Sequence, residues 1–443
     1  MKKTIFKILT GFAAFALISM LFIPTGGNRP KNVVYYWYVA GANDNIPPSV
    51  TLFNKSQDSI KVIATPIPWT EHEKKVLTSI LSGDPPDVIN LVTPVPKWAA
   101  RKALVELDEA IKRDKYDTTQ FFESLWHEMK YRGGTYALPA YTASFALLYN
   151  KKMFREAGLD PDKPPKTWDE LKEYSKKIFR KENGKIQRMG FIPHYGNIET
   201  PLIFAFELGA ELADKNASKV NLTQPAVVEG FQWEKDFFDI YTFNEVNSFM
   251  GSMGYGSQHG FISGKVAMMI NDNSFIDQIA KYNPGLDYGV AMIPRFRNSE
   301  SVSSAGSWWL AIPRGAKNKA AAWEFIKFAV SHDTQLKESM TRGESLFPAN
   351  RLAANDSVFL AINSHMKVFT RQMESTRSKT IVPLAHDIFW REFGIARERV
   401  LRGIQTPEQA LSEAQRSVQS FLNRAYDYDN YVNTKMKAER YFD

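Results

Sequence analysis

Aromatic, amide and carboxylate side chains follow the ends of several predicted strands, and their types suit the binding of a ligand. In open α/β sheets, ligands bind beyond the carboxyl ends of the strands. An aromatic ring can cover the apolar face of a sugar, while Asp, Asn, Glu or His can bond its rim of hydroxyls. The positions of this kind are Trp37, Tyr38, Trp69, Tyr141, His194, Tyr195, Asn271, Asp272, Asn273, Trp308, Trp309, Phe389 and Trp390. Burial in a core explains any single aromatic equally well, but the set as a whole favours a sugar site.

The sequence contains no motif that indicates covalent or metal chemistry. The run from Gly260 to Val266 resembles a phosphate-binding loop, but it has one residue too few between its glycines and ends in Val where Ser or Thr must bind magnesium. The seven His are scattered and there is no Cys, so we expect no metal and no cofactor. Two carboxylates at the right separation could hydrolyse a glycosidic bond, so an exported lyase or hydrolase is the alternative to a binding protein.

The stretch from Tyr131 to Asp160 organises the rest of the chain. Adjacent glycines at Gly133 and Gly134 predict a tight turn, because glycine accepts positive φ without a Cβ clash. An aromatic and aliphatic segment follows, and Pro139 predicts a break in it because proline cannot donate to a central strand ladder. We therefore expect the chain to leave one sheet at Pro139 and enter another at Phe145, which is a crossing between two lobes.

The run YALPAYTASFALLYNKKMFREAGLDPDKPPKTWDELKEYSKKI resembles the crossover of the extracellular solute-binding proteins of ABC importers, specifically the large sugar-binding, maltose-binding-protein-like group. Members of that group typically read Y-x-x-P, then Y-N-K, then A-G-L, then P-x-T-W-x-E-L. The matching pieces here are Tyr136–Pro139, Tyr149–Lys151, Ala157–Leu159 and Pro165–Leu171. The resemblance extends over roughly residues 32–425, and its long ordered match is more specific than a single short motif.

The resemblance implies a two-lobed α/β fold of the periplasmic binding-protein type (type II-like), with about three crossings between the lobes. It also implies a receptor that captures a sugar or oligosaccharide between the lobes and delivers it to a membrane permease. Residues expected to bond ligand hydroxyls are Asn43, Asn90, His194, Glu199, Asp272 and Asn273, and those expected to stack on the ligand are Trp37, Trp69, Tyr141, Trp308 and Trp390. A receptor that passes ligand occupancy to a sensor is a third class.

Length predicts two lobes, because 443 residues exceed the size at which a single core usually keeps growing. Strands predicted near 32–39, 59–67 and 87–92 alternate with helices, which implies a parallel sheet with right-handed crossovers. The expected division is a leader at 1–30, a first lobe at 31–143 plus 272–330, and a second lobe at 144–271 plus 331–443. Strands predicted at 288–293 and 307–312 are expected in the first lobe, and the crossings near 142–146, 269–275 and 330.

Residues 1–30 are typical of an export signal. Lys2, Lys3 and Lys7 form a basic start, and an apolar run from Ile8 to Ile23 follows. Cleavage would release a periplasmic protein, whereas an uncleaved leader would act as an anchor in the cell envelope, although it is short for a membrane span. Without Cys, the chain has neither disulfides nor the lipidated cysteine that anchors many relatives.

The formal net charge of +8 is small and dispersed, and three of its lysines belong to the leader. It does not indicate nucleic-acid binding. The expected partners are the sugar ligand and the membrane subunits of a permease, and we expect a monomer.

Trp308 and Trp309 are neighbours on a predicted strand, so their side chains point to opposite faces. One is expected to pack into the lobe and the other to reach the cleft. The resemblance favours Trp308 for the cleft and Trp309 for the core.

Overall fold

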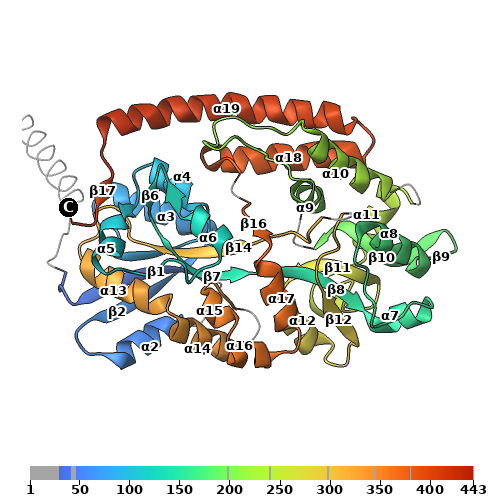
Figure 1. The fold of residues 1–443 in the computed structure, drawn as a ribbon, viewed down its shortest axis with the longest axis horizontal. Helices are drawn as coiled ribbons and strands as arrows, with labels where there is room; N and C mark the ends of the chain where they lie inside the picture. The colour runs from blue at the N-terminus through green and yellow to red at the C-terminus, as the bar shows by residue number, and fades with distance from the viewer. Residues whose placement is uncertain are drawn as a thin grey trace, which may run out of the picture.

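The computed structural model describes residues 29–40, 46–196, 199–238, 241–296, 299–342, 346–379 and 381–442. Two α/β lobes lie side by side in Figure 1, which confirms the predicted fold class. The leader and Asn43 fall outside the described residues, so what the sequence indicates for them stays a prediction. Within the described ranges, no helix is both long enough and apolar enough to cross a membrane.

The first lobe is built on a mixed six-stranded sheet. The strand order is β15 (Phe347–Pro348), β7 (Leu138–Ala143), β14 (Gly306–Ala311), β3 (Val88–Leu91), β1 (Val33–Ala40) and β2 (Lys61–Pro68). Strand β1 pairs in parallel with both β2 and β3, as the alternation of strands and helices predicts, whereas β14 is antiparallel to both of its neighbours, β3 and β7. Alternate residues of β1 are buried because successive side chains point to opposite faces, and Tyr36 packs against Phe325 on helix α13 (Lys319–Ala329).

Helices cover both faces of this sheet. They are α2 (Pro48–Ser56), α3 (Trp69–Leu81), α4 (Val95–Ala100), α5 (Asp108–Arg113), α6 (Glu123–Glu128) and α13, with the short strands β4 (Val105–Glu106), β5 (Lys130–Tyr131) and β6 (Gly134–Thr135). One core lies between the sheet and α2 and α13, and another contains Trp98 and Trp309 beside α3 and α4. The β5–β6 hairpin confirms the predicted turn, with Gly133 at a φ of 86°.

The second lobe has a five-stranded sheet of its own. Its order is β12 (Tyr288–Ala291), β8 (Phe145–Asn150), β11 (Val266–Asp272), β10 (Lys185–Gly196) and β9 (Arg180–Glu182). Its helices are α7 (Lys151–Glu156), α8 (Trp168–Ile178), α9 (Thr200–Glu207), α10 (Pro225–Asp236), α11 (Phe243–Met250) and the 3₁₀ turn η1 (Gly256–Gln258). The prediction that the strand near 288–293 joins the first lobe is wrong. Strand β12 pairs antiparallel with β8, because helix α12 (Phe275–Tyr282) returns the chain to that nearer edge.

A helical base lies under both lobes. It contains α12, α14 (His332–Arg342), α15 (Arg351–Ala354), α16 (Ser357–Ile362), α17 (Met366–Met373) and the paired strands β13 (Ser303–Ser304) and β16 (Thr376–Arg377). Phe347, Phe359 and Phe369 share a core with Leu148 of the second sheet. Because β15 pairs with β7 in the first sheet, residues after 330 do not belong to the second lobe alone, as had been expected.

The chain crosses between the lobes at points that differ from the predicted ones. The first crossing lies at Ser144, between β7 and β8. Pro139 remains inside β7, where its missing N–H is tolerated next to a bulge: Ala140 is an extra residue of β7 opposite the consecutive Trp308 and Trp309 of β14. The second crossing lies between β12 and β14 and the third follows β16, because β11 and β12 both belong to the second sheet and β15 still belongs to the first.

The C-terminal helices add a fourth link between the lobes. They are the 3₁₀ turn η3 (Pro383–Ala385), α18 (His386–Leu401) and α19 (Pro407–Lys435), followed by strand β17 (Glu439–Arg440). The first half of α19 packs into the second lobe through Leu411 and Val418. Farther along, Asp429 accepts a hydrogen bond from Arg132 at 2.6 Å, and β17 pairs with β4 of the first lobe. Helix α19 therefore spans both lobes, as Figure 1 shows.

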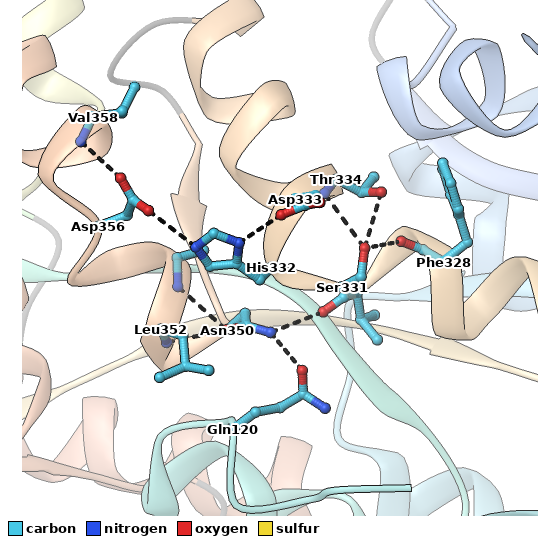
Figure 2. Close-up of polar contacts among 12 residues, drawn as sticks. Gln120, Phe328, Ser331, His332, Asp333, Thr334, Asn350, Leu352, Asp356 and Val358 are labelled. Carbon is cyan, nitrogen blue, oxygen red and sulfur yellow. Dashed lines mark hydrogen bonds and ion pairs between the residues drawn. The ribbon is translucent and has the colours of Figure 1, made fainter. Parts of the chain in front are cut away.

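A polar network joins helices α14 and α16 of the helical base (Figure 2). The ring of His332 at the start of α14 lies between two carboxylates: Nδ1 is 2.8 Å from Asp333 Oδ1, and Nε2 is 3.1 Å from Asp356 Oδ2. Asp356 also caps α16, because its Oδ1 accepts a hydrogen bond from the Val358 N–H at 2.8 Å. The hydrogen bond with Asp333 is the largest cause that raises the pKa of His332.

This network predicts a pH-dependent contribution to stability. The folded protein favours the protonated ring of His332, so the stabilisation is complete below the reference pKa of 6.5 and is lost as the pH rises through the raised folded value. We expect the difference in melting temperature between the wild type and His332→Gln to be largest below pH 6.5 and to shrink at higher pH. Thermal unfolding at a series of pH values measures it, with the exposed His127→Gln as the control. A difference that does not change with pH would contradict this role.

Candidate functional site

One group of residues from both lobes lies around Lys379, and we call it the interlobe floor: Glu128, Phe145, Glu199, Asp272 and Lys379. Lys379 follows β16, which lies between α6 of the first lobe and α9 of the second in Figure 1. Its Nζ lies over the ring of Phe145, 5.0 Å from the centroid, and 4.0 Å from Glu199 Oε2. Asp272 is the cross-strand partner of Phe145 on β11, at the first crossing.

Glu128 completes the floor from the first-lobe side. It ends helix α6, is only 6% exposed, and its Oε1 accepts a hydrogen bond from Ser378 Oγ at 2.5 Å. Burial raises the pKa of Glu128 to about 7, so this carboxyl exchanges its proton near neutral pH. It can therefore both donate and accept hydrogen bonds in that range.

Lys379 is the cation at the centre of this arrangement. Burial lowers its pKa, and the carboxylates of Glu199, Glu128 and Asp272 act in the opposite direction. The floor thus combines one ammonium donor with several carboxylate acceptors, above the ring of Phe145, which is itself buried. That combination suits a polyhydroxylated ligand, because hydroxyls can donate to the carboxylates and accept from the ammonium group. Among the described residues, no group of three or more His, Asp or Glu is arranged to hold a metal ion.

Trp69 is the most open of the predicted stacking residues. It directly follows strand β2 as the first residue of helix α3, and it is 59% exposed. Trp37, near the end of β1, is half-buried against the core beside α3 and α4. Asn90, in β3, is buried, and its Nδ2 donates to the backbone oxygen of Trp309 at 3.4 Å. The carboxyl ends of β1 to β3 therefore offer an exposed ring, whereas Asn90 itself is enclosed in the lobe.

The two tryptophans of β14 lie in different environments. Trp309 is 4% exposed and belongs to the core that contains Trp98, which confirms its predicted position. Trp308 is half-buried, and its ring lies 5.4 Å from that of Tyr141 on the neighbouring strand β7. The two rings form one aromatic pair beside the crossing strands, and a role of this pair in ligand binding stays a prediction.

Two of the predicted polar residues have structural contacts. The ring of His194 lies between Phe238 and Phe243 at centroid distances of 5.6 and 5.5 Å, and burial lowers its pKa. It therefore belongs to the packing of the second lobe and not to the interlobe floor. Asn273 is buried, and its Oδ1 accepts from the Ser144 N–H at 3.1 Å, so it holds the first crossing in place.

Trp390 lies on α18, half-buried and edge-to-face with Phe393. The structure thus brings Glu199 and Asp272 together with Lys379, but it leaves Asn90, His194 and Trp390 elsewhere. Glu128 and Lys379 are absent from the predicted set. Neither has a sequence signal of its own, because the pairing of β16 with β13, far apart in the chain, places the segment that carries Lys379.

A buried ion pair supports the second-lobe side of the site. Arg397 on α18 donates through Nε to Glu234 Oε2 at 2.8 Å, and Glu234 is 1% exposed. The same guanidinium donates through Nη2 to the backbone oxygen of Pro193 at 3.3 Å. It therefore connects α10 and α18 to the end of β10, in the segment that leads to Glu199.

The comparisons with known proteins agree with this architecture. A family model for the bacterial extracellular solute-binding protein matches residues 27–336. The sn-glycerol-3-phosphate-binding periplasmic protein UgpB of Brucella abortus (strain 2308) is 25% identical over 349 residues, or 75% of this chain and 76% of that protein. The maltotriose-binding protein of Pyrococcus abyssi (strain GE5 / Orsay) is 27% identical over 292 residues, or 63% of this chain and 58% of that one. The structure of CpMnBP1 with mannotriose bound has a TM-score of 0.73 and 28% identity, over 87% of this chain and 99% of that chain. The chain belongs to the family of bacterial extracellular solute-binding proteins.

Proposed function

We propose that this protein captures a sugar or oligosaccharide at the interlobe floor and delivers it to the permease of an ABC importer. The observation that carries the proposal is the set of hydrogen-bond donors and acceptors gathered around Lys379, between two lobes of this family's fold. Relatives that bind maltotriose and mannotriose support a sugar as the ligand. Crossings near the floor allow the lobes to close over a ligand by hinge motion.

The proposed setting is the periplasm or cell envelope, with the protein acting as a monomer. The basic and apolar leader at residues 1–30 supports export. Whether that leader is cleaved or kept as an anchor is decided by mass spectrometry of the native protein. The expected result is an exported protein, and an intact Met1 in a cytoplasmic fraction would contradict export.

A thermal-shift screen against mono- and oligosaccharides, followed by calorimetric titration, tests the proposed function. We expect at least one sugar to raise the melting temperature and to bind with a single site. Chromatography of the recovered ligand separates binding from the alternative, an exported lyase or hydrolase, because a binding protein returns the sugar unchanged. The family consists of binding proteins, which favours unchanged sugar. Recovery of shortened or unsaturated sugars would instead show that the protein is a hydrolase or a lyase.

Trp69→Ala is expected to weaken sugar binding about tenfold, which corresponds to about 1.4 kcal/mol. The exposed ring at the end of β2 offers an apolar face to a sugar, and alanine removes that face without opening a cavity. Calorimetric titration measures the change. Tyr431→Ala is the matched control, because Tyr431 is similarly exposed, at 60%, but lies on α19. Equal affinities for the wild type and Trp69→Ala would remove Trp69 from the site.

A further inference from the structure

We propose that the interlobe floor selects uncharged sugars over anionic ones, and that Glu199 and Lys379 are specificity-determining residues with opposite effects on this choice. The inference rests on the proposed function and extends it by naming the charge class of the ligand. It is carried by the way carboxylates from different parts of the fold surround one ammonium group.

The carboxylates come from three separate segments. Glu128 ends α6 in the first lobe, Asp272 ends β11 at the first crossing, and Glu199 precedes α9 in the second lobe. Lys379 lies 4.0 Å from Glu199 Oε2 and above the ring of Phe145, the cross-strand partner of Asp272, and it interacts electrostatically with all three carboxylates. Two carboxylates, Glu199 and Asp272, against one ammonium group leave the floor with one excess negative charge, and ionised Glu128 adds a second.

An anionic ligand is expected to bind to this floor more weakly than a neutral one. The ammonium group of Lys379 already has Glu199 as its partner, so a carboxylate or phosphate of the ligand would have to compete for it. The remaining acceptors would repel the ligand's charge, and juxtaposed like charges suppress wrong partners in interfaces. A neutral sugar avoids both costs, because each hydroxyl can donate to one group and accept from another.

Two other cations lie near the floor, and one of them, Arg397, also attracts Glu199. Arg397 is engaged with Glu234 behind the loop that leads to Glu199. Arg377 on β16 lines a separate groove of about 780 Å³, together with Glu123 and Glu300. Within the described residues, Lys379 is therefore the cation that faces the floor together with carboxylates from both lobes.

Matched neutral and anionic sugars test the inference. Calorimetric titrations would compare β-1,4-mannotriose, maltotriose and cellotriose with the counterparts in which each C6 hydroxymethyl group is oxidised to a carboxylate. We expect the neutral form of whichever sugar binds to do so at least about tenfold more tightly, and we expect added salt to narrow that preference by screening the repulsion. Equal or tighter binding of the oxidised form would overturn the inference while leaving a sugar receptor in place. If no sugar binds, in these series or in the thermal-shift screen, the proposed function fails and this inference fails with it.

Two variants are expected to change the preference for the neutral sugar in opposite directions, which makes the test more specific. Glu199→Gln removes one negative charge and should narrow the preference for the neutral sugar several-fold, whereas Lys379→Gln removes the positive charge and should widen it. Glu173→Gln, on the exposed face of α8, is the charge-matched control and should leave the preference unchanged. Melting temperatures confirm that the variants are folded. The assigned roles would be overturned if Glu199→Gln and Lys379→Gln changed the preference for the neutral sugar in the same direction. A merely structural defect would not depend on the sign of the lost charge, so only opposite changes support a direct electrostatic role.

Discussion

Replacing Trp309 by alanine is expected to lower the free energy of unfolding by roughly 3–5 kcal/mol, the usual cost of removing a large aromatic side chain from a core. Trp309 is 4% exposed and fills the space between β14 and the helices α3 and α4, with Trp98 in the same core. The sheet and helices around it cannot collapse fully into the space that alanine leaves. Chemical denaturation monitored by circular dichroism measures the change.

Trp309→Phe provides the matched control for this prediction. The indole Nε1 of Trp309 is buried without a hydrogen-bond partner among the described residues, so phenylalanine removes an unsatisfied donor while keeping most of the ring. The expected loss is only about 1–2 kcal/mol, because the smaller cavity is partly offset by the removal of that donor. Trp308→Ala should cost less stability than Trp309→Ala, since Trp308 is half-buried. The reverse order for the two alanine variants would show that the faces of β14 are assigned incorrectly.

Arg397→Met is expected to cost about 3–5 kcal/mol of stability, because it leaves the carboxylate of Glu234 buried without its partner. Glu234 is 1% exposed, and its two oxygens accept hydrogen bonds from the Arg397 guanidinium. The variant should also loosen the end of β10, where Arg397 holds the backbone oxygen of Pro193, and so weaken sugar binding. Denaturation and calorimetric titration of the same sample measure the two effects separately.

The double variant Arg397→Met with Glu234→Leu separates the ion pair from simple packing. Replacing both partners by apolar side chains removes the unpaired charge, so we expect the double variant to recover most of the lost stability. A double variant that is no more stable than Arg397→Met alone would contradict the explanation by an uncompensated buried charge.

The fold was largely predictable wherever hydrophobic periodicity and turn residues act locally. The parallel strands β1 to β3 and the Gly133 turn follow from such patterns, and the ordered motifs of the crossover predicted the family. The exact points at which the chain crosses between the lobes could not be predicted from these local patterns. Pro139 suggested a break, but a bulge at Ala140 of β7 lets it remain in that strand. Strand β12 belongs to the second sheet because it pairs with the edge of β8, which lies far away in the sequence. Such outcomes depend on neighbours far away in the sequence.

The site was predictable only in part, for the same reason. Residues that follow strands, such as Trp69 and Glu199, carry a local signal, since strand ends gather at one edge of a sheet. Lys379 and Glu128 carry none: a short two-residue strand pair and the end of a six-residue helix bring them together. His194 had the right type and a position near the end of a strand, but aromatic residues of α11 and the loop before it enclose its ring.

The central claim, that a sugar binds at the interlobe floor, is tested most directly by a crystal structure with a sugar identified in the screen. The account predicts electron density between the lobes, with sugar hydroxyls within hydrogen-bond distance of Glu199 and Lys379 and a pyranose face against an aromatic ring. Density for the sugar only in the groove beside Arg377, or only in the cavity of about 390 Å³ between α4, α18 and α19, would contradict it.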